Sequence, residues 1–534
     1  MKLNIIKNMV PAALLALAMG ATSCVGNLDV TPPEGTSTIM NPDANALFAK
    51  CYANMAVAGN GGANGDCDID GLDGGTTGFV RQMFNANELT TDEAICGWGD
   101  EGISDFCFNS YGASHPMLKG FYYRLYFGVT MCNDFIGRYK DTKEVTDDMI
   151  AEVRFLRALY FYFLMDGWGN IPFMEEMSKE KAPQKDRKFM YNYIETELLD
   201  CVNNMKDPRK NTYGRADKAA AWLLLARLYL NAEVYTGTAQ WSKAAEYAKL
   251  VMNSEYKLHV NASTEKWSAY QELFMGNNGE NGAQEEAILA LLQDGTDTTS
   301  WGTTLFIMAG CWSDDMKFPG LELNGTSEKW TGNRARPDLV AKFFPDGDAP
   351  NIEAYNMPAK AGDDRALFWG KDRNYNVENV SKFEEGFSVA KFTNFYTTGQ
   401  VGHNSQFPDT DFFLMRVAEA YLTFAEATAR ENGGKLTPAG VEAMNMVRGR
   451  AHAIQYTDYA LPEILDEWSR EFYFEGRRRI DLIRFNNFGG NNSYYWQWKG
   501  GAFLGASFPA YRNVFAIPDT DLNANRNLKQ NEGY

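Results

Sequence analysis

The feature that most constrains the fold is a set of apolar helical segments in which alanine is interspersed with large side chains. Residues 151–165 and 217–232 place leucine and aromatic side chains at helical spacing, and Gly167 with Pro172 is expected to end the first helix. Residues 241–252 follow the second after a glycine-containing turn. Alanine beside leucine, tyrosine and tryptophan at this spacing is typical of the closely packed helix pairs of tetratricopeptide repeats. The sequence therefore predicts a scaffold of helix pairs.

Further segments repeat this pattern toward the C-terminus. Residues 413–430 are expected to form a helix that pairs with residues 439–451 across the glycine pair 433–434. Another helix is expected over residues 462–474. The basic run 477–479 that follows is interpreted as structural, because arginines near a helix end can pair with carbonyl groups and acids there.

Long stretches rich in glycine, asparagine and aspartate separate the helices, notably over residues 56–120 and 276–410. Loops of this length in a compact chain usually carry function. The sequence therefore predicts a mostly α fold, in which a tetratricopeptide-like helix-pair scaffold holds long irregular ligand-binding loops.

The first residues are typical of an export signal. Lys2 and Lys7 give a positive start, residues 9–18 are apolar, and small residues lead directly into Cys24. This ending resembles a bacterial lipobox, so we predict a lipoprotein signal peptide over residues 1–23 and a lipid on Cys24. An ordinary signal peptide followed by an unrelated cysteine is the alternative. No later segment has the roughly 20 apolar residues of a membrane span, so we expect a soluble body tethered by lipid.

Charge and cysteine content argue against several classes of protein. The formal net charge is -18, with 51 Lys and Arg against 69 Asp and Glu, and an acidic surface disfavours nucleic acid, whose phosphates are held by Lys and Arg. The cysteines after Cys24 are odd in number and have no C-x-x-C spacing, which argues against zinc ribbons, redox motifs and disulfide scaffolds. We expect these cysteines to be free thiols: Cys51, Cys67, Cys96, Cys107, Cys132, Cys201 and Cys311.

Catalytic motifs are missing from the sequence. It contains no H-E-x-x-H zinc motif, no G-x-S-x-G nucleophile elbow and no phosphate-binding glycine loop. A glycosidase needs two carboxylates about 5–9 Å apart across a cleft, whereas the acid pairs 314–315 and 363–364 are interpreted as solvated loop residues. We therefore predict a protein that is not an enzyme, while a pair of carboxylates distant in sequence stays open.

One acidic segment matches part of a calcium-binding loop. Asp66, Asp68 and Asp70 precede Gly71 with the spacing of the first half of a D-x-D-x-D-G loop. Thr77 stands at position twelve, where a bidentate glutamate is needed. A structural calcium ion is one interpretation, and an acidic loop that caps turns is the other. No other cofactor is expected.

Several segments together resemble the SusD (RagB/SusD) family, the cell-surface glycan-binding lipoproteins of Bacteroidetes. They follow one another in the family's order behind the lipobox, which makes the combination specific although each segment alone is weak. The segments are residues 87–93 (N-E-L-T-T-D-E), 151–158 with 168–172, 214–218 with 226–230, 414–422, 445–450, 470–479, 517–518 and 525–534. The resemblance implies one SusD-like body over residues 24–534, with an N-terminal region 24–235 and a C-terminal region 236–534.

The likeness within the family is greatest to its starch-binding member, which implies one site where an arc of aromatic rings meets the curve of an α-glucan. By position, Trp98, Trp301 and Trp330 match the arc, and Arg81 matches a polar contact. Residues 99–102 depart from the family pattern, because Gly-Asp-Glu-Gly replaces an amide-containing sequence. The polar residues expected beside the rings are Asp73, Asp100 and Glu101.

The local sequences of the tryptophans separate two groups. Trp98, Trp301 and Trp330 lie among glycine and polar residues, as in exposed loops, where an indole ring can receive the apolar face of a sugar. Trp222 lies in mid-helix among alanine and leucine and is expected in the core. Helix packing is the interpretation for Trp168, Trp241 and Trp468.

The resemblance implies a non-catalytic lipoprotein of the outer membrane that faces the cell exterior. It would capture starch-like α-glucan oligosaccharides and deliver them to a SusC-like TonB-dependent transporter. Three alternatives remain: the same role for another polysaccharide, a scaffold that binds peptide or protein, and a surface glycoside hydrolase.

Overall fold

The computed structural model describes residues 43–321 and 323–534. The predicted signal peptide and Cys24 lie outside the described residues. Residues Phe48–Tyr534 form one unit, which begins inside helix α3 (Ala44–Ala53).

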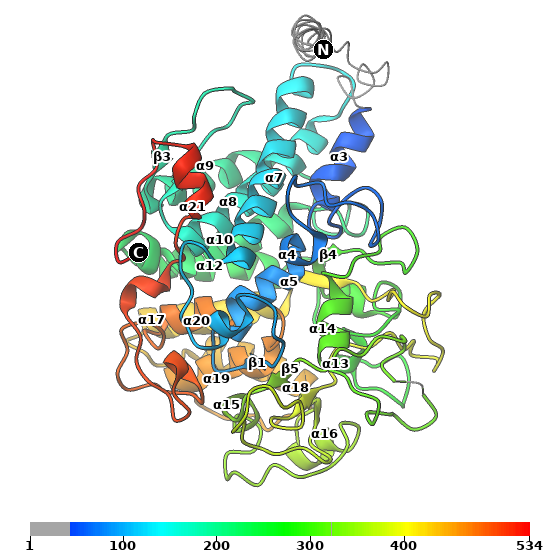
Figure 1. Ribbon diagram of the computed structural model, residues 1–534. Helices are drawn as coiled ribbons and strands as arrows, with labels where there is room; N and C mark the ends of the chain where they lie inside the picture. Colours follow the sequence, from blue (N-terminus) through cyan, green and yellow to red (C-terminus); the bar gives the residue numbers. More distant parts are fainter. Residues whose placement is uncertain (1–42, 322) are drawn as a thin grey trace, which may run out of the picture. The chain divides into compact units, whose positions relative to one another are not determined.

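Paired helices form the N-terminal part of this unit (Figure 1). They are α7 (Pro116–Tyr139), α8 (Asp147–Trp168), α9 (Arg187–Cys201), α10 (Lys218–Leu230), α11 (Ala232–Thr236) and α12 (Trp241–Met252). Helix α7 packs on α8, α8 on α9, and α10 on α12. Small residues permit this approach, since the ring of Tyr160 leaves no room for a Cβ at Gly128. The predicted helix-pair scaffold is confirmed.

Side chains at the first residues determine where several of these helices begin. The His115 ring accepts a hydrogen bond from the Leu118 N–H (3.2 Å) at the start of α7, and Asp217 accepts one from the Ala219 N–H (2.8 Å) at the start of α10. The predicted end of α8 was wrong by a few residues. Gly167 remains helical, and the helix ends at Trp168, because Gly169 adopts a positive φ of 68° at the C-cap.

A second helical group follows in the C-terminal part: α17 (Ala418–Glu431), α18 (Pro438–Arg450), α19 (Leu461–Phe472) and α20 (Arg478–Arg484). Helix α17 packs on α12, α18 and α19, and it joins the two groups (Figure 1). The predicted break after α17 is confirmed, since Gly433 and Gly434 both have positive φ (68° and 88°).

The prediction that the helix begins at residue 413 was wrong. Residues Phe412–Arg416 form strand β8, which pairs antiparallel with β4 (Ala287–Leu291). All five residues of each strand are buried. The sequence of a strand buried on both faces is a nearly continuous apolar run. The spacing of its apolar residues alone does not distinguish it from a buried helix.

Shorter elements make up the rest of the unit. The helical ones are α4 (Gly74–Thr77), α5 (Phe79–Phe84), the π-helix η1 (Asn85–Leu89), α6 (Ile103–Cys107), η2 (Val202–Asn204), α13 (Ala269–Glu272), η3 (Ala283–Glu285), α14 (Thr304–Gly310), α15 (Pro337–Val340), α16 (Met357–Ala361), η4 (Lys499–Gly501), η5 (Ala510–Asn513) and α21 (Asp519–Ala524). The strands are β1 (Ala94–Cys96), β2 (Ile171–Pro172), β3 (Gln184–Lys185), β5 (Asn333–Ala335), β6 (Phe368–Trp369) and β7 (Ser388–Val389). They pair in twos, β1 with β5, β2 with β3, and β6 with β7.

The stretch 56–120 is therefore more ordered than the predicted irregular loop. It contains α4, α5, η1, β1, α6 and the start of α7, and residues 82–96 are buried throughout. The prediction of an irregular loop was wrong because it rested on polar composition. Several of these polar side chains are buried and pair with arginine residues inside the protein.

Two motifs far apart in the sequence meet in this interior. Glu88 accepts a hydrogen bond from the Arg477 N–H (2.9 Å), and Asp92 accepts two from the Arg478 guanidinium (2.7 and 2.8 Å). Arg479 is likewise buried and pairs with Asp166 (2.9 Å). The structural interpretation of the basic run 477–479 is confirmed. Strand β1 begins two residues after Asp92, so the contacts of Glu88 and Asp92 fix the start of that strand.

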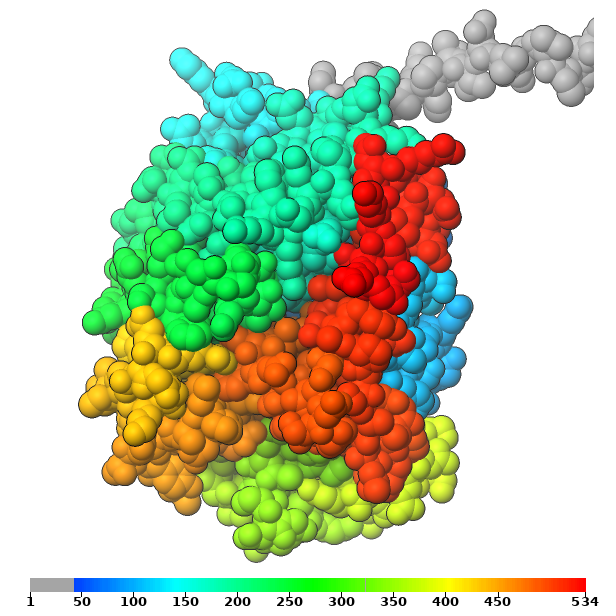
Figure 2. All heavy atoms as spheres, turned by 90° about the vertical axis from the view of Figure 1, so that its left-hand side faces the viewer, coloured from blue at the N-terminus to red at the C-terminus, as the bar shows by residue number. Residues whose placement is uncertain are grey.

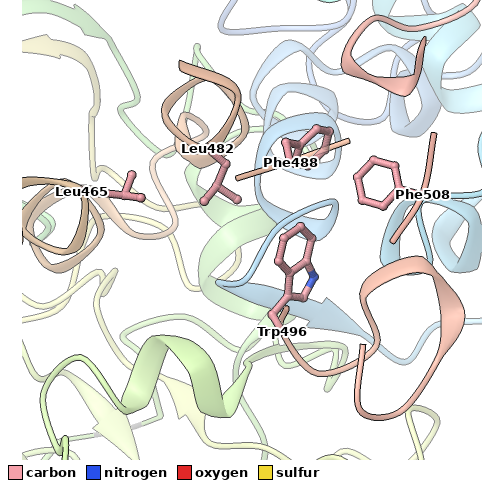
Figure 3. Close-up of a cluster of buried hydrophobic side chains, with 5 residues drawn as sticks. All are labelled: Leu465, Leu482, Phe488, Trp496 and Phe508. Atoms are coloured by element: carbon pink, nitrogen blue, oxygen red, sulfur yellow. The ribbon is translucent and has the colours of Figure 1, made fainter. Parts of the chain in front are cut away.

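A hydrophobic cluster supports the segment after α20. Its buried members are Leu465, Leu482, Phe488, Trp496 and Phe508 (Figure 3). The rings of Phe488 and Trp496 stack, with centroids 6.1 Å apart and an interplanar angle of 18°. The cluster therefore ties α19 and α20 to the C-terminal segment.

The last residues return to the helix pairs of the N-terminal part. The Gln184 amide donates a hydrogen bond to the Lys529 carbonyl (2.9 Å), and the Asn527 amide donates one to the Lys181 carbonyl (2.9 Å). Figure 2 shows the C-terminal segment, in red, lying beside the teal residues of this part.

Burial of the helical tryptophans follows the prediction in part. Trp168 and Trp468 are buried. Trp222 and Trp241 are only half-buried, so the prediction that Trp222 lies in the core was wrong. A mid-helix position among alanine and leucine does not specify which face of the helix a side chain occupies.

No disulfide bond joins the cysteines that the structure describes, as predicted: Cys51, Cys67, Cys96, Cys107, Cys132, Cys201 and Cys311. All are buried except Cys67, which is half-buried. Burial raises the pKa of the Cys96 and Cys107 thiols, so these groups pack as small apolar side chains.

A buried carboxyl group beside β8 gives a pH-dependent prediction. Asp411 accepts hydrogen bonds from the Gln293 N–H (2.8 Å) and the Tyr213 hydroxyl (2.7 Å). Burial, with smaller contributions from Asp409 and Asp294, raises the pKa of Asp411 from 3.8 to about 7. The folded protein therefore holds this proton in a pH range where the unfolded chain has lost it. Stability from this group is present below about pH 4 and is lost as the pH rises through about 7.

Asp411→Asn is expected to remove this contribution to the pH dependence. Asparagine keeps an acceptor and a donor in place of the protonated carboxyl group. The free energy of unfolding should therefore rise by about 4 kcal/mol at pH 8 and change little at pH 4. Urea denaturation of both proteins across this range measures the difference. An equal difference at both ends would contradict the raised pKa.

Candidate functional site

Strand pairing brings two of the predicted tryptophans together. Trp98 follows β1 and Trp330 precedes β5, and β1 and β5 pair antiparallel. The ladder continues outward through a hydrogen bond from the Gly97 N–H to the Gly332 carbonyl (3.1 Å). The Trp98 indole N–H then donates to the Trp330 carbonyl (2.9 Å). The Trp98 ring lies so close to Gly332 that a Cβ there would collide with it.

The third tryptophan is held by a different contact. Trp301 lies three residues before α14, and the carbonyl of the next residue, Gly302, accepts a hydrogen bond from the Arg81 N–H (2.9 Å). Gly78 and Gly302 approach so closely that a Cβ on either would be 3.0 Å from the Cα of the other. Two glycines thus let the Trp301 segment lie against the start of α5.

Together Trp98, Trp330 and Trp301 form a continuous row of rings, which we call the tryptophan row. The ring centroids of Trp98 and Trp330 are 6.4 Å apart at an interplanar angle of 56°, and those of Trp330 and Trp301 are 6.1 Å apart at 45°. All three side chains are half-buried. Because successive rings are tilted, the row presents a curved apolar surface rather than a flat one.

Arg81 lies at the Trp98 end of the row. Its guanidinium carbon is 5.9 Å from the centroid of the Trp98 ring and 5.1 Å from that of Phe306. Its partner Asp100 is 3.7 Å away and exposed. Burial lowers the pKa of Arg81, although Asp100 and Asp73 oppose this shift. The group remains a cation with donors close to the rings.

The other predicted polar residues differ in their relation to the row. Asp73 is exposed and caps α4 by accepting a hydrogen bond from the Thr76 N–H (2.8 Å). Asp100 joins the row through Arg81. Glu101 is exposed in the turn before α6, and among the described residues it has no contact with the rings of the row.

The structure adds residues that the sequence did not indicate. Phe306 packs edge-on against Trp98 (5.7 Å), and Phe407 packs against Trp301 (4.8 Å). The Trp330 indole N–H donates to Glu328 (2.8 Å), whose other carboxylate oxygen accepts from Gln406 (2.9 Å). Only Glu328 is close enough in sequence to be found from the Trp330 motif. The others come from distant segments.

The three aspartates of the calcium interpretation are not gathered as metal ligands. The Asp68 carboxylate pairs with Lys50 (2.6 Å) and with the buried Arg124 (2.8 Å). Within residues 43–321 and 323–534, no group of three acidic, histidine or cysteine side chains is placed to hold a metal ion. Asp68 therefore serves as an internal ion-pair partner.

Comparison with known proteins assigns the family. Residues 285–534 match the model of the SusD family, and residues 28–230 match one described as starch-binding associating with outer membrane. The chain is 39% identical to the starch-binding protein SusD of Bacteroides thetaiotaomicron over an alignment of 570 positions, which covers 100% of each chain. The chain belongs to the SusD family. A SusD-like protein of Bacteroides ovatus is 22% identical over 76% of this chain and 71% of its own length.

Solved structures of SusD-like proteins share the fold. A laminarin binding SusD-like protein is 20% identical, with a TM-score of 0.64 over 92% of this chain and 99% of its own. Surface glycan-binding protein A from Bacteroides thetaiotaomicron, in complex with laminarihexaose, is 18% identical, with a TM-score of 0.65 over 91% of this chain and 98% of its own. The predicted SusD-like fold is confirmed.

The prediction that the chain is not an enzyme agrees with its family, because the relative that is 39% identical is described as a binding protein. The described helices include none with both the length and the apolarity needed to cross a bilayer.

Proposed function

We propose that this SusD family member is a non-catalytic glycan-binding lipoprotein of the outer membrane, which captures starch-like α-glucan oligosaccharides at the cell surface. The observation that carries the proposal is the tryptophan row. A pyranose presents an apolar C–H face to an aromatic ring, and the tilt between successive rings suits a ligand that curves, as an α-glucan helix does. The 39% identity to a starch-binding protein supports the same ligand class.

We propose distinct roles for the residues of this site. Trp98, Trp330 and Trp301 receive successive sugar rings, while Arg81 donates hydrogen bonds to hydroxyl groups and Asp100 accepts them. Asp73 and Glu101 are exposed nearby in sequence and are assigned a secondary role at the margin of the site. Titration of single alanine variants at these two positions tests that ranking.

Native affinity electrophoresis tests the ligand. We expect the full chain, solubilised in a detergent without a sugar headgroup, to be retarded by amylopectin and pullulan, and not by dextran, levan or xyloglucan. Retardation only by another of these polymers would mean that the protein has the same role for a different polysaccharide. Steady release of reducing ends would favour a glycoside hydrolase. No retardation by any polymer, together with tight capture of peptides, would favour the peptide-binding alternative.

We propose that the protein is anchored through a lipid on Cys24, behind a signal peptide over residues 1–23. Cys24→Ala is expected to release the protein from membranes, because no other anchor is proposed. Fractionation of cells that express either form, followed by immunoblotting, measures the release. Membrane association that survives the substitution would contradict the lipid anchor.

A SusC-like TonB-dependent transporter is the proposed recipient of the bound oligosaccharide. Family membership and the outer-membrane description of the matched model support this partner. Co-purification of such a transporter with the affinity-tagged full chain, from membranes of cells grown on starch, tests the association.

A further inference from the structure

A second aromatic site lies apart from the tryptophan row. It is a hollow of about 520 Å³, which is within the range of small-molecule sites. Its walls come from α13 with the residues before it, the segment after α14, α16 with its flanking residues, and His452 after α18. None of the described residues that line it belongs to the tryptophan row.

Three rings form the floor of the hollow. Trp267 and Phe318 are more than nine-tenths buried, and their centroids are 6.1 Å apart. Tyr355 packs on Phe318 at 5.7 Å and remains 38% exposed. The exposed tyrosine ring is therefore backed by buried aromatic side chains, so it can receive a ligand with little loss of conformational freedom.

Hydrogen-bond donors and acceptors both line the rim of the hollow. Lys266 is exposed, and its ammonium group is 5.0 Å from the centroid of the Trp267 ring. The carboxylate of Asp364 pairs through one oxygen with the His452 ring (2.6 Å), and the histidine side chain is 75% exposed. Asp363 also lines the hollow, but both of its carboxylate oxygens bind a buried arginine.

The chemistry of this lining restricts the ligand. Lys266 and His452 can donate, while the second oxygen of Asp364 can accept. A cation and an anion both face the rim, so a strongly charged ligand of either sign would meet one unfavourable partner. A neutral molecule with an apolar face and several hydroxyl groups satisfies the exposed ring and both kinds of polar group.

We propose that this hollow is a second saccharide site, which binds a short neutral segment of glycan with a pyranose ring against Tyr355. The inference rests on the ligand class of the proposed function and goes beyond it, because the site shares no residue with the tryptophan row. One chain would then hold glycan at two separate places.

Isothermal titration calorimetry of the full chain, in a detergent without a sugar headgroup, tests the proposal. The probes are maltotriose, isomaltotriose and laminaritriose. We expect two classes of sites for the wild type with at least one of the three, and one remaining class for the double variant Trp98→Ala/Trp330→Ala. Adding Tyr355→Ala to that double variant should weaken the remaining class by about tenfold or more, since one aromatic contact is removed. Tyr495→Ala serves as a matched control, because Tyr495 is 44% exposed outside the hollow.

The other outcomes separate the two proposals. A single class of sites that Trp98→Ala/Trp330→Ala removes and Tyr355→Ala leaves unchanged would overturn the second site while supporting the tryptophan row. If the class of sites that remains in Trp98→Ala/Trp330→Ala is unaffected by adding Tyr355→Ala, the second site does not lie in this hollow, and the proposal is overturned. If no trisaccharide binds to any protein, the hollow is not a saccharide site, and the polysaccharide gel decides the proposed function separately.

Discussion

Replacing Trp330 with alanine is expected to weaken glucan binding by about 30-fold or more, the largest loss from any single substitution in the tryptophan row. Trp330 is the central ring and contacts both Trp98 and Trp301, so its loss divides the row. Truncation of a central aromatic side chain at a binding site typically costs about 2–4 kcal/mol. Affinity electrophoresis in amylopectin and calorimetry with a maltooligosaccharide measure the change.

A matched variant separates binding from stability in this test. Trp241→Ala also removes a half-buried tryptophan, but from helix α12, where the Arg430 guanidinium lies 6.0 Å from the ring. We expect it to leave glucan binding unchanged. Trp330→Ala should lower the thermal midpoint by no more than Trp241→Ala does. A large loss of stability with unchanged affinity for Trp330→Ala would mean that this ring belongs to the core.

Arg478→Met is expected to reduce the free energy of unfolding by about 3–5 kcal/mol, the largest predicted effect on stability. The guanidinium of Arg478 is buried and forms two hydrogen bonds with Asp92, which is also fully buried. Burial alone would raise the pKa of Asp92, but Arg478 and Lys342 together hold it well below its usual range. Removing Arg478 leaves a buried carboxylate with too little compensating charge.

An exposed ion pair provides the control for this prediction. Lys210 and Glu255 approach to 2.7 Å, and both side chains are more than half exposed. Lys210→Met should change stability by less than about 1 kcal/mol. Urea denaturation of both variants, with glucan binding measured in parallel, compares the two pairs. Similar small losses in both would contradict an essential role for the buried pair, whereas a loss confined to Arg478→Met would confirm it.

Stability and binding are connected through this pair. Asp92 lies two residues before β1, and β1 ends two residues before Trp98. Arg478→Met should therefore also weaken glucan binding under conditions where the variant is still mostly folded, because the strand that positions Trp98 loses its fixed start.

Much of the helical scaffold could be predicted because its signals are local. Helix α12 has the predicted bounds, and α10 and α18 differ from prediction by one or two residues. Strand β8 could not be predicted, because its first four residues are an apolar run without alternation and its fifth, Arg416, is buried as well. The ordered segment 82–96 could not be predicted either, because it is rich in polar residues rather than apolar ones. Its polar residues look solvated until their partners, such as Arg478, are known.

The candidate site was predictable only in part. Its three tryptophans were indicated by loop-like local sequences and by family resemblance, and Arg81 by the resemblance alone. Phe306 and Phe407 were missed, since both lie in apolar or mixed surroundings that do not distinguish a platform from a core. The hollow at Tyr355 gave no sequence signal, because its walls come from four separate segments.

The sequence by itself determined the helix pairs, because the spacing of small and large residues along a helix is a property of each segment alone. It also determined which loops carry tryptophan. Only the tertiary structure decided that these rings form one row. The hydrogen bond from Trp98 to the Trp330 carbonyl joins residues 232 positions apart, and it depends on the pairing of β1 with β5. Such a contact arises from packing between distant segments, and local spacing therefore does not encode it.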